Sequence, residues 1–248
     1  MNVCHPYFDR VHIFDSYASR PGKGVHLAVK RAAKYTRQWP WYLKMDIRQF
    51  FASIDHSILK GQLARLFKEH KLLGIFDQII DSYHRLGTKG LPIGNLSSQY
   101  FANHYLTTLD HHIKEVWKAK AYVRYMDDLV IWSGDKATLK RLNASIEEYV
   151  QTRLALELKP SILNRSHRGL TFCGYRLIPY RVGLSKRSDK RYLQKMMDLD
   201  QQYLNGEWEE SACQRKAQSL VAFTEHADAL GFRKKVWARL PSNQRKII

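Results

Sequence analysis

Apolar and polar residues alternate over residues 41–47, WYLKMDI. The odd-numbered positions are all apolar, whereas Lys44 and Asp46 fall on even-numbered positions. A period of two residues is typical of a β-strand with one face toward a core. The pattern therefore predicts a half-buried strand whose polar face carries one carboxylate at its end.

Helical periodicity follows this strand. Asp55 is a suitable N-cap for a first helix, and a second helix follows it along the chain. Glycines at three positions predict a loop over residues 84–95, and a long third helix is expected to begin at Ser97 or Ser98. The apolar stripes of the three helices consist, in chain order, of Leu59, Leu63, Leu66 and Phe67; Ile75, Phe76, Ile79, Ile80 and Tyr83; and Phe101, Tyr105, Leu109, Ile113 and Val116.

Residues 121–132, AYVRYMDDLVIW, predict two apolar strands interrupted by an acidic pair. Asp135 can cap a further helix, and short strands are expected at Leu170–Phe172 and Tyr175–Ile178. Beyond a basic stretch at 181–195, the remaining chain has a helical pattern. This order differs from the regular alternation of a doubly wound sheet. It predicts an α+β fold with an antiparallel sheet covered by helices on one face.

Composition adds an expected class of binding partner to this fold. Hydrophobic residues make up 44% of the 248 residues, which is enough for a core. The formal charge is +18, from 41 Lys and Arg against 23 Asp and Glu. A field of this sign attracts polyanions, so nucleic acid is the expected partner. A ribosome-bound protein or a binder of anionic membrane surfaces is the alternative.

The three cysteines, Cys4, Cys173 and Cys213, are scattered and form no CxxC pair. They predict neither a zinc site nor a disulfide framework, and they fit a reducing cytosol. No apolar run approaches the roughly 20 residues that span a bilayer. The N-terminus lacks the pattern of an export signal. We therefore expect a cytoplasmic protein without a membrane partner.

The tetrapeptide YMDD, Tyr125–Asp128, carries the most chemical information. Adjacent carboxylates between apolar strands are costly unless positive charge neutralises them. A hairpin there would project Asp127 near the strand end that carries Asp46. Carboxylates from two strands can hold two Mg²⁺ ions, with Mn²⁺ as a substitute, for phosphoryl transfer. The alternative is a solvated hairpin turn, in which Asp is common.

The segments KMDIRQFFASID, PIGNLSSQ, YMDD and GLTFCGYRL occur in this order at spacings that match the palm of reverse transcriptases. Residues 16–178 resemble successive motifs of that family. DSYASRPGKGVHLAV, LPIGNLSSQYFANHYL and the pair Ser98-Gln99 resemble the enzymes of bacterial and phage diversity-generating retroelements. The resemblance implies partial fingers and a palm over 1–185, and a helical, basic, thumb-like subdomain over 186–248.

The resemblance also implies an activity and its participants. It is that of an RNA-directed DNA polymerase, which makes error-prone cDNA from a dedicated, structured RNA template. The expected partners are this template, a DNA or RNA primer, deoxynucleoside triphosphates and an accessory protein. The expected location is the cytoplasm of a bacterium or a phage-infected cell.

Several positions match metal-binding and catalytic residues of the family. Asp46, Asp127 and Asp128 match the metal-binding carboxylates, and the backbone carbonyl of Ile47 is implied as a further ligand. Lys159, in LELKPS, lies near the lysine that resembles a proton donor to pyrophosphate. A solvated surface lysine is the alternative for Lys159.

Other positions match the nucleotide pocket. Phe51 matches the aromatic residue that blocks a ribose 2′-hydroxyl, with core filling as the alternative; core filling is the interpretation for Phe50. Gly94 matches a loop that approaches the nascent base pair, although it could also serve only as a turn. Ile93 stands where many accurate viral enzymes carry glutamine. This departure predicts loose checking of the base pair and errors directed by template adenines.

The remaining assignments concern nucleic acid and the triphosphate. Ser98 and Gln99 are expected near the template and the incoming nucleotide, although Ser98 could instead cap its helix. Arg20 and Lys23 are candidate triphosphate contacts. Residues expected to contact the template–primer, unless they only form plain strands or a solvated face, are Tyr125, Phe172, Gly174, Tyr175, Arg181, Lys186, Arg187, Lys190, Arg191 and Lys195.

One departure from the family pattern leaves rival interpretations open. DSYASRP begins at residue 15, whereas related enzymes carry a preceding segment that forms most of the fingers. The chain is therefore expected to be a fragment, half of a split enzyme, or a remnant that needs a partner. A non-catalytic or partner-dependent nucleic-acid-binding subunit is the main rival, and the intact aspartates favour the enzyme. A group II intron-like or antiviral reverse transcriptase would share the chemistry.

Overall fold

The computed structural model of the chain describes residues 1, 3–83 and 87–244. It separates into two compact units, Met1–Ser166 and His167–Ile248, which we call the first and the second unit. The first three residues of the loop predicted at 84–95 lie outside the described residues.

The first unit contains a four-stranded antiparallel sheet in the order β2-β3-β1-β4. The strands predicted at 41–47 and 121–132 are confirmed. The last strand was not predicted, because its four residues, ILNR, show no clear alternation. The strands are β1 (Trp41–Asp46), β2 (Ala121–Tyr125), β3 (Asp128–Ser133) and β4 (Ile162–Arg165).

Helices surround this sheet, and two predicted N-caps are confirmed. Asp55 accepts a hydrogen bond from the backbone N–H of Ile58, and Asp135 accepts bonds from the N–H groups of Ala137 and Thr138. The helices are α1 (His5–Val11), α2 (Val25–Gln38), α3 (Phe50–Ser53), α4 (His56–Leu66), α5 (His70–Asp81), α6 (Leu96–Tyr105), α7 (Thr107–His111), the π-helix η1 (His112–Val116) and α8 (Lys136–Leu154).

The long helix expected from Ser97 or Ser98 is three helical segments, α6, α7 and η1. The first of these begins at Leu96 with Asn95 as its N-cap residue, so helix capping by Ser98 is wrong. Ser98 instead lies inside the helix and is fully buried. The apolar stripe continued through the breaks at residues 106 and 112, which is why periodicity alone did not reveal them.

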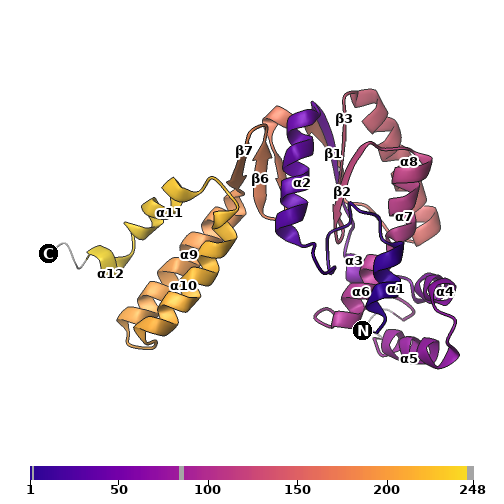
Figure 1. The fold of residues 1–248 in the computed structure, drawn as a ribbon, viewed down its shortest axis with the longest axis horizontal. Helices are drawn as coiled ribbons and strands as arrows, with labels where there is room; N and C mark the ends of the chain where they lie inside the picture. Colours follow the sequence, from indigo (N-terminus) through magenta and orange to yellow (C-terminus); the bar gives the residue numbers. More distant parts are fainter. Residues whose placement is uncertain (2, 84–86, 245–248) are drawn as a thin grey trace. The chain divides into compact units, whose positions relative to one another are not determined.

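The two faces of the sheet have different surroundings. Leu43 and Met45 are buried on the face that packs under α7 and α8. On the other face α2 covers the far half, where the rings of Tyr35 and Trp132 lie 5.5 Å apart. Figure 1 shows α2 on one side of the sheet and α7 and α8 on the other. The α+β class is confirmed, whereas the prediction of helices on one face is corrected, because α2 covers the far half of the second face. The end of that face near Asp46 stays partly open.

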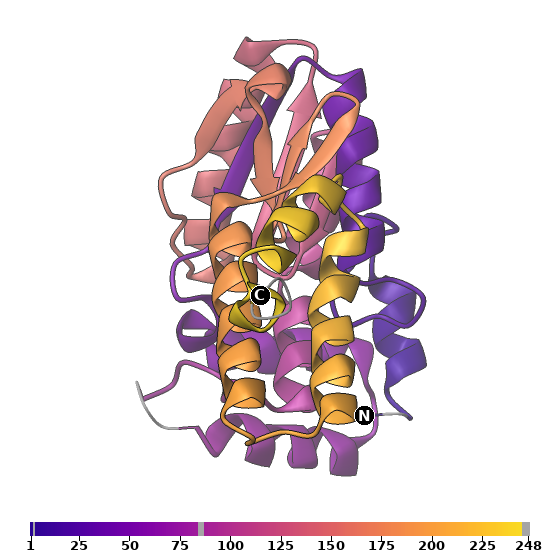
Figure 2. The same cartoon turned by 90° about the vertical axis from the view of Figure 1, so that its left-hand side faces the viewer.

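The second unit combines a three-stranded antiparallel sheet with four helices. The strands predicted at Leu170–Phe172 and Tyr175–Ile178 are confirmed as β5 and β6. Helices α9 and α10 run side by side (Figures 1 and 2). The other elements are η2 (Ser166–Arg168, at the border), β7 (Arg181–Leu184), α9 (Lys186–Leu204), α10 (Glu210–Glu225), α11 (Leu230–Trp237) and α12 (Pro241–Gln244).

The compact units divide the chain earlier than residue 185, where the sequence analysis placed a boundary. The small sheet packs with the C-terminal helices because of specific bonds. The hydroxyl of Tyr175 donates to the carbonyl of Phe223 at 2.7 Å, and the N–H of Ser185 donates to the carbonyl of Gly174 at 3.0 Å. The labels palm and thumb for the two parts remain predictions.

Among the described residues, no helix combines the length and the apolarity that crossing a bilayer requires.

The fold makes a prediction about Tyr105, which joins α6 to α8. Its buried hydroxyl donates to the carbonyl of Leu154 at 2.6 Å, near the end of α8. Tyr105→Phe should lower the free energy of unfolding by about 1–3 kcal/mol, because a buried carbonyl loses its donor. Urea unfolding measures this change, with Tyr7→Phe, on an exposed ring, as the control. Equal stability of the two variants would contradict the assignment.

Candidate active site

Three carboxylates gather where β1 meets the β2–β3 hairpin. Asp46 and Asp128 are direct partners in the β1–β3 ladder, so their side chains leave the same face of the sheet. Asp127 lies in the adjoining two-residue turn between Tyr125 and Asp128. Like charges directly opposite one another destabilise a sheet, since their Cβ atoms are only about 4.5–5.5 Å apart. This end of the sheet therefore requires positive charge.

The protonation of the carboxylates reflects this shortage of positive charge. Burial raises the pKa of Asp128 to about 6, against the attraction of Lys44, and the neighbouring aspartates add to the rise. Burial is also the main cause of the raised pKa of Asp127, and Asp46 contributes to it. Within the described residues, Oδ1 of Asp128 is buried without a hydrogen-bond partner.

Two lysines supply positive charge to this site. Nζ of Lys44 lies 3.0 Å from Oδ2 of Asp128, and Nζ of Lys159 lies 2.7 Å from Oδ1 of Asp46. The backbone N–H of Lys159 also donates to the carbonyl of Asp46 at 2.8 Å, which fixes the position that the sequence left open. The hydrogen bond to Asp46 raises the pKa of Lys159, so its ammonium group stays charged.

The three aspartates have the right chemistry to bind a divalent cation, but in this conformation their carboxylates are not positioned to coordinate one. No three His, Cys, Asp or Glu side chains in the described part of the chain are placed so that they could hold a metal ion. Carboxylate oxygens are the ligands that Mg²⁺ prefers, and Asp128 has a buried oxygen without a partner. Mg²⁺ would be held by Asp46, Asp127 and Asp128, at the place that the two ammonium groups now neutralise.

The backbone carbonyl predicted as a further ligand belongs to Ile47. Its neighbours Asp46 and Arg48 make their backbone bonds to the segment 157–159. Peptide groups alternate in direction along an extended chain, so the carbonyl of Ile47 points away from that segment. This orientation is compatible with the predicted role, which stays a prediction.

Phe51, Ile93 and Gly94, which were predicted for the nucleotide pocket, lie on two segments joined by a backbone hydrogen bond. The N–H of Leu91 donates to the carbonyl of Phe51 at 2.8 Å, which ties the loop carrying Ile93 and Gly94 to α3. Phe51 is half-buried, whereas Phe50 is buried in the core as predicted. Ile93 is 84% exposed. Gly94 has a φ of +104° with open space around it, so its backbone conformation, rather than crowding, favours glycine.

Arg20 and Lys23, the residues predicted to contact the triphosphate, already form hydrogen bonds within the protein. Arg20 is 8% exposed and donates to Asp9 at 2.7 Å and to the carbonyls of Ile13 and Ser16. It therefore anchors its own segment in this conformation and offers little to a triphosphate. Nζ of Lys23 donates to the carbonyl of Phe14 at 3.0 Å, although this contact is exposed.

The predicted template contacts differ in accessibility. Ser98 is fully buried, so in this conformation it cannot touch a template strand. Gln99 is partly exposed, and its amide oxygen accepts a bond from the hydroxyl of Ser19 at 3.1 Å. Tyr125, at the end of β2, is also partly exposed. The periodicity placed Ser98 at the start of a helix, where a side chain is usually accessible, and this is why its burial was missed.

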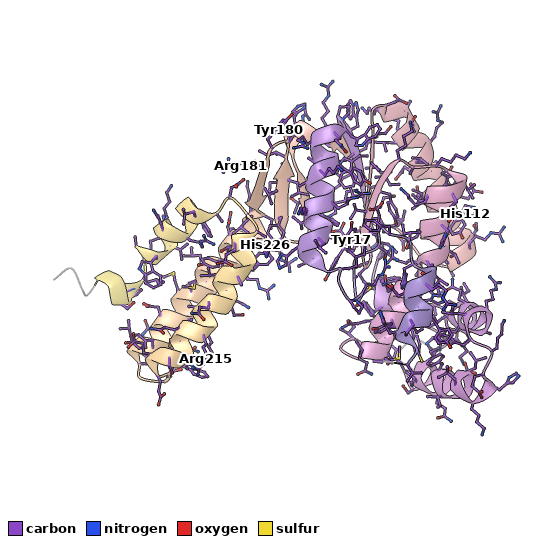
Figure 3. All side chains as sticks on the ribbon, viewed as in Figure 1. Tyr17, His112, Tyr180, Arg181, Arg215 and His226 are labelled. Atoms are coloured by element: carbon purple, nitrogen blue, oxygen red, sulfur yellow. The ribbon has the colours of Figure 1, made fainter. Side chains whose placement is uncertain are left out.

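In the second unit the basic residues predicted to contact phosphates are exposed. Figure 3 shows Arg181 beside Tyr180 at the outer end of the β6–β7 hairpin. On α9 the pairs Lys186 and Lys190, and Arg187 and Arg191, are each four residues apart and lie on one side of the helix. Two of these cations lie in the first turn, where the helix dipole disfavours positive charge, so a bound anion would relieve the repulsion.

The turn predicted to contact the primer is packed against its own unit. Cys173 and Gly174 both have positive φ, as a type I′ hairpin turn requires. A Cβ at Gly174 would lie 3.0 Å from Phe223 and Ser188, so glycine is needed for this close approach. Phe172 and Tyr175 are fully buried, which agrees with the plain strand interpretation of these two residues.

Two residues near the carboxylates, Lys44 and Arg124, were not predicted as site residues. Lys44 lies two residues before Asp46 on the same strand face, which was a usable signal. Arg124 is fully buried beneath the hairpin and pairs with Asp110 at 2.5 Å. A lone arginine within an otherwise apolar strand was the signal there, because an unpaired buried charge is rare.

Sequence comparisons show which known proteins this chain resembles. The family described as reverse transcriptase (RNA-dependent DNA polymerase) has a sequence model that matches residues 5–177, more than half of the chain. An uncharacterized mitochondrial protein, ymf11, of Marchantia polymorpha is 22% identical over 62% of this chain and 27% of its own length. An uncharacterized 91 kDa protein in a cob intron of Schizosaccharomyces pombe is 25% identical over 41% and 13%. The chain thus spans about a quarter or less of these relatives.

Solved structures share the fold. The apo telomerase of Candida tropicalis, truncated from its C-terminal domain, aligns with a TM-score of 0.59 and 16% identity, over 74% of this chain and 44% of that one. The telomerase of Candida albicans in complex with a TWJ fragment of telomeric RNA gives 0.58 and 11% identity, over 79% and 42%. At these identities the likeness concerns the fold alone.

The site predicts a pH-dependent effect of Asp128→Asn on metal-free protein. The folded-state pKa of Asp128 is about 6 and its ordinary value is 3.8. Between these values the folded state binds more protons than the unfolded state, so wild-type stability rises as pH falls. Asparagine carries no charge at any pH. The variant should therefore melt higher than wild type at pH 7.5, and the difference should shrink toward pH 5.

Thermal unfolding at the two pH values tests this prediction. Asp135→Ala is the matched control, because hydrogen bonds from Thr138 and Ala137 lower the pKa of that exposed carboxylate. Its loss should reduce the melting temperature at pH 7.5. A shift for Asp128→Asn that is the same at both pH values would contradict the prediction.

Proposed function

This chain belongs to the reverse transcriptase family, and we propose that it catalyses RNA-templated DNA synthesis by two-metal-ion nucleotidyl transfer. The observation that carries the proposal is the meeting of Asp46, Asp127 and Asp128 on a partly open end of the sheet, against the repulsion of their charges. Bound cations would offset this repulsion and stabilise the arrangement. Because the chain spans only part of its relatives, its activity and substrates are inferred.

The chain's own residues divide the chemical work. When bound, Mg²⁺ ions lower the pKa of a primer 3′-hydroxyl and stabilise the leaving pyrophosphate. Asp46, Asp127 and Asp128 provide the oxygens that hold and orient them. Lys159 is 51% exposed and keeps a proton at Nζ beside Asp46, so its position suits a proton donor to pyrophosphate. Release from Asp46 would lower the pKa of Lys159 toward its ordinary value and make it a stronger acid. Lys44 stabilises Asp128 from within the same strand face.

Substrate selection is assigned to Phe51, on α3, and to Ile93, in the loop tied to α3. The ring of Phe51 would fill the space of a ribose 2′-hydroxyl, which favours deoxynucleotides. Ile93 presents an exposed apolar side chain that offers contact area and no hydrogen bond to a base pair. Discrimination between a correct and an incorrect base pair by shape alone is typically about 1–3 kcal/mol. We therefore infer a polymerase with high misincorporation.

We further propose that the template is the dedicated, structured RNA of a diversity-generating retroelement, copied in a bacterial or phage-infected cytoplasm with an accessory protein. The motif LPIGNLSSQYFANHYL, including Ser98-Gln99, supports this branch. A group II intron-like enzyme is the alternative within the same chemistry. The relative encoded in a cob intron favours that alternative.

A partner-dependent subunit is the second candidate function. Its supporting observation is that lysines neutralise Asp46 and Asp128 in this conformation, while Arg20 is engaged by Asp9. In that case primer extension would require the partner. Assays with and without the products of neighbouring genes separate the two candidates.

The first prediction of the proposal concerns the carboxylates. Asp46→Asn and Asp127→Asn should each lower primer extension on an RNA template by roughly 10³-fold or more, since metal ions contribute several kcal/mol to the transition state. Affinity for an RNA–DNA duplex should be nearly unchanged, and the melting temperature should not fall, because each variant removes one of the mutually repelling charges. Asp135→Asn is the control, on an exposed N-cap. Wild-type extension rates in either active-site variant would sink the proposal.

The second prediction concerns α9. Each phosphate contact contributes about 0.9 to the slope of log K against log salt. Replacing Lys190 and Arg191 together by Ala should remove two phosphate contacts. The slope for an RNA–DNA duplex should therefore become less steep by about 1.8. Fluorescence anisotropy over a range of salt concentrations measures it. The control replaces Lys68 and Lys71, which are exposed in the first unit. Equal slopes in the two double variants would show that Lys190 and Arg191 of α9 do not contact the phosphates.

The third prediction concerns fidelity. Ile93→Gln should lower misincorporation about tenfold at template adenines, since a hydrogen bond then adds roughly 1–2 kcal/mol to discrimination by shape. Sequencing of cDNA made on a defined RNA template measures the error rate. Ile75→Gln, on another exposed isoleucine, serves as the control. Low and equal wild-type error at all four template bases would overturn the retroelement branch and leave the polymerase in place.

A further inference from the structure

Arg124 is a fully buried arginine on β2, two residues before the turn of the active-site hairpin. Its guanidinium group has five N–H donors, and the structure gives each of them an acceptor. Nε donates to Asp110, Nη1 to Asn103 Oδ1 and to the carbonyl of Met126, and Nη2 to Asp110 and to the carbonyl of Asn103. The group therefore has a single defined orientation.

The carbonyl of Met126 belongs to a strained turn. Met126 has a φ of +55° and is the first of the two turn residues, a position that usually favours glycine. Nη1 of Arg124 holds the carbonyl of this residue at 3.0 Å. Asp127 is the second turn residue, so its direction depends on the same peptide. Strain of this kind persists where the surroundings impose it.

The opposite side of the guanidinium group is fixed by α7. Nε lies 2.8 Å and 3.0 Å from the two oxygens of Asp110, and Nη2 lies 2.5 Å from Oδ2. The hydroxyl of Tyr122 also donates to Asp110 at 2.7 Å. A buried ion pair is often no more stable than apolar residues of the same volume. Stability alone is therefore a weak reason for this pair, and geometry is a stronger one.

Arg124 also contacts the N-terminal segment of the first unit. Its N–H donates to the carbonyl of Asp15 at 2.9 Å, and its carbonyl accepts from Tyr17, which is labelled in Figure 3, at 3.0 Å. Asn103 accepts from Nη1 at 2.7 Å and donates to the carbonyl of Ala18 at 2.9 Å. The segment that holds Arg20 and Lys23 and the hairpin that holds Asp127 thus share one anchor.

We propose that Arg124 is a positioning residue that sets the orientation of the Met126–Asp127 turn, and that Asn103 links this orientation to the N-terminal segment. The inference rests on the proposed function, because the direction of Asp127 matters only where it binds a metal ion. Arginine is required because its planar fork reaches Asp110, Asn103 and Met126 together. A lysine has a single ammonium group and cannot span them.

Arg124→Lys tests the inference while keeping the charge opposite Asp110. The control is Arg31→Lys, which alters an arginine–carboxylate pair with Asp15 at 2.9 Å and leaves the side-chain hydrogen bonds of Arg124 to Asp110, Asn103 and Met126 in place. Three quantities are measured on each protein: the melting temperature, Mn²⁺ affinity by electron paramagnetic resonance without nucleic acid, and kcat and KM for deoxynucleotides in primer extension.

We expect Arg124→Lys to stay folded but to melt below the control, because several buried acceptors lose their donors. It should bind Mn²⁺ about 10–100-fold more weakly and lose kcat by a similar factor, with little change in KM. Mn²⁺ affinity and kcat equal to those of the control would overturn the inference. Wild-type protein that neither binds Mn²⁺ nor extends a primer would instead overturn the proposed function. The two failures are therefore distinguishable.

Asn103→Ala provides the second variant if Arg124→Lys does not fold. It removes the amide that joins Ala18 to Arg124 and leaves the Asp110 pair intact. Weaker Mn²⁺ binding and a lower kcat in a folded Asn103→Ala protein support the link between the segment and the hairpin. Wild-type values for both quantities contradict it.

Discussion

Repulsion between Asp46 and Asp128, direct partners in an antiparallel ladder, is the constraint on which the rest of this structure depends. With Asp127 in the adjoining turn, the end of the sheet carries three carboxylates, and burial raises the pKa of two of them. Lys44 and Lys159 neutralise the site in this conformation. Helix α2 covers the far half of this face and leaves the charged end partly open. The fold gains no stability from such a cluster unless cations bind it.

The opposite face of the sheet holds the cluster in place. Leu43 and Met45 belong to a buried core under α7 and α8, so β1 cannot shift its register to separate Asp46 from Asp128. The turn between β2 and β3 contains a non-glycine residue at positive φ, and a fully bonded arginine beneath it holds that peptide. Repulsion, strain and a buried charge occur together at one end of the sheet, around the β2–β3 hairpin. Local rules of stability are broken in this way mainly at functional sites.

The sequence predicted those features that depend on local pattern. Period-two alternation located β1 and the hairpin strands, and Asp55 and Asp135 were correctly assigned as N-caps. Features that depend on tertiary contact were not predictable in this way. The breaks between α6, α7 and η1 keep the apolar stripe intact, and the burial of Ser98 depends on packing. Arg20, in the loop between α1 and α2, is engaged by Asp9 of α1. The predicted roles of Phe51, Ile93 and the α9 cations involve molecules outside the chain and remain predictions.

The most direct test of the account is the location of metal ions at the hairpin. Crystals would be grown with Mn²⁺, an RNA–DNA template–primer that ends in a dideoxynucleotide, and the matching deoxynucleoside triphosphate. Two-metal-ion catalysis predicts anomalous scattering peaks beside the carboxylates of Asp46, Asp127 and Asp128, with Lys44 and Lys159 no longer neutralising them alone. A structure with bound template–primer, no peak at these carboxylates and both lysines still paired with them would contradict it.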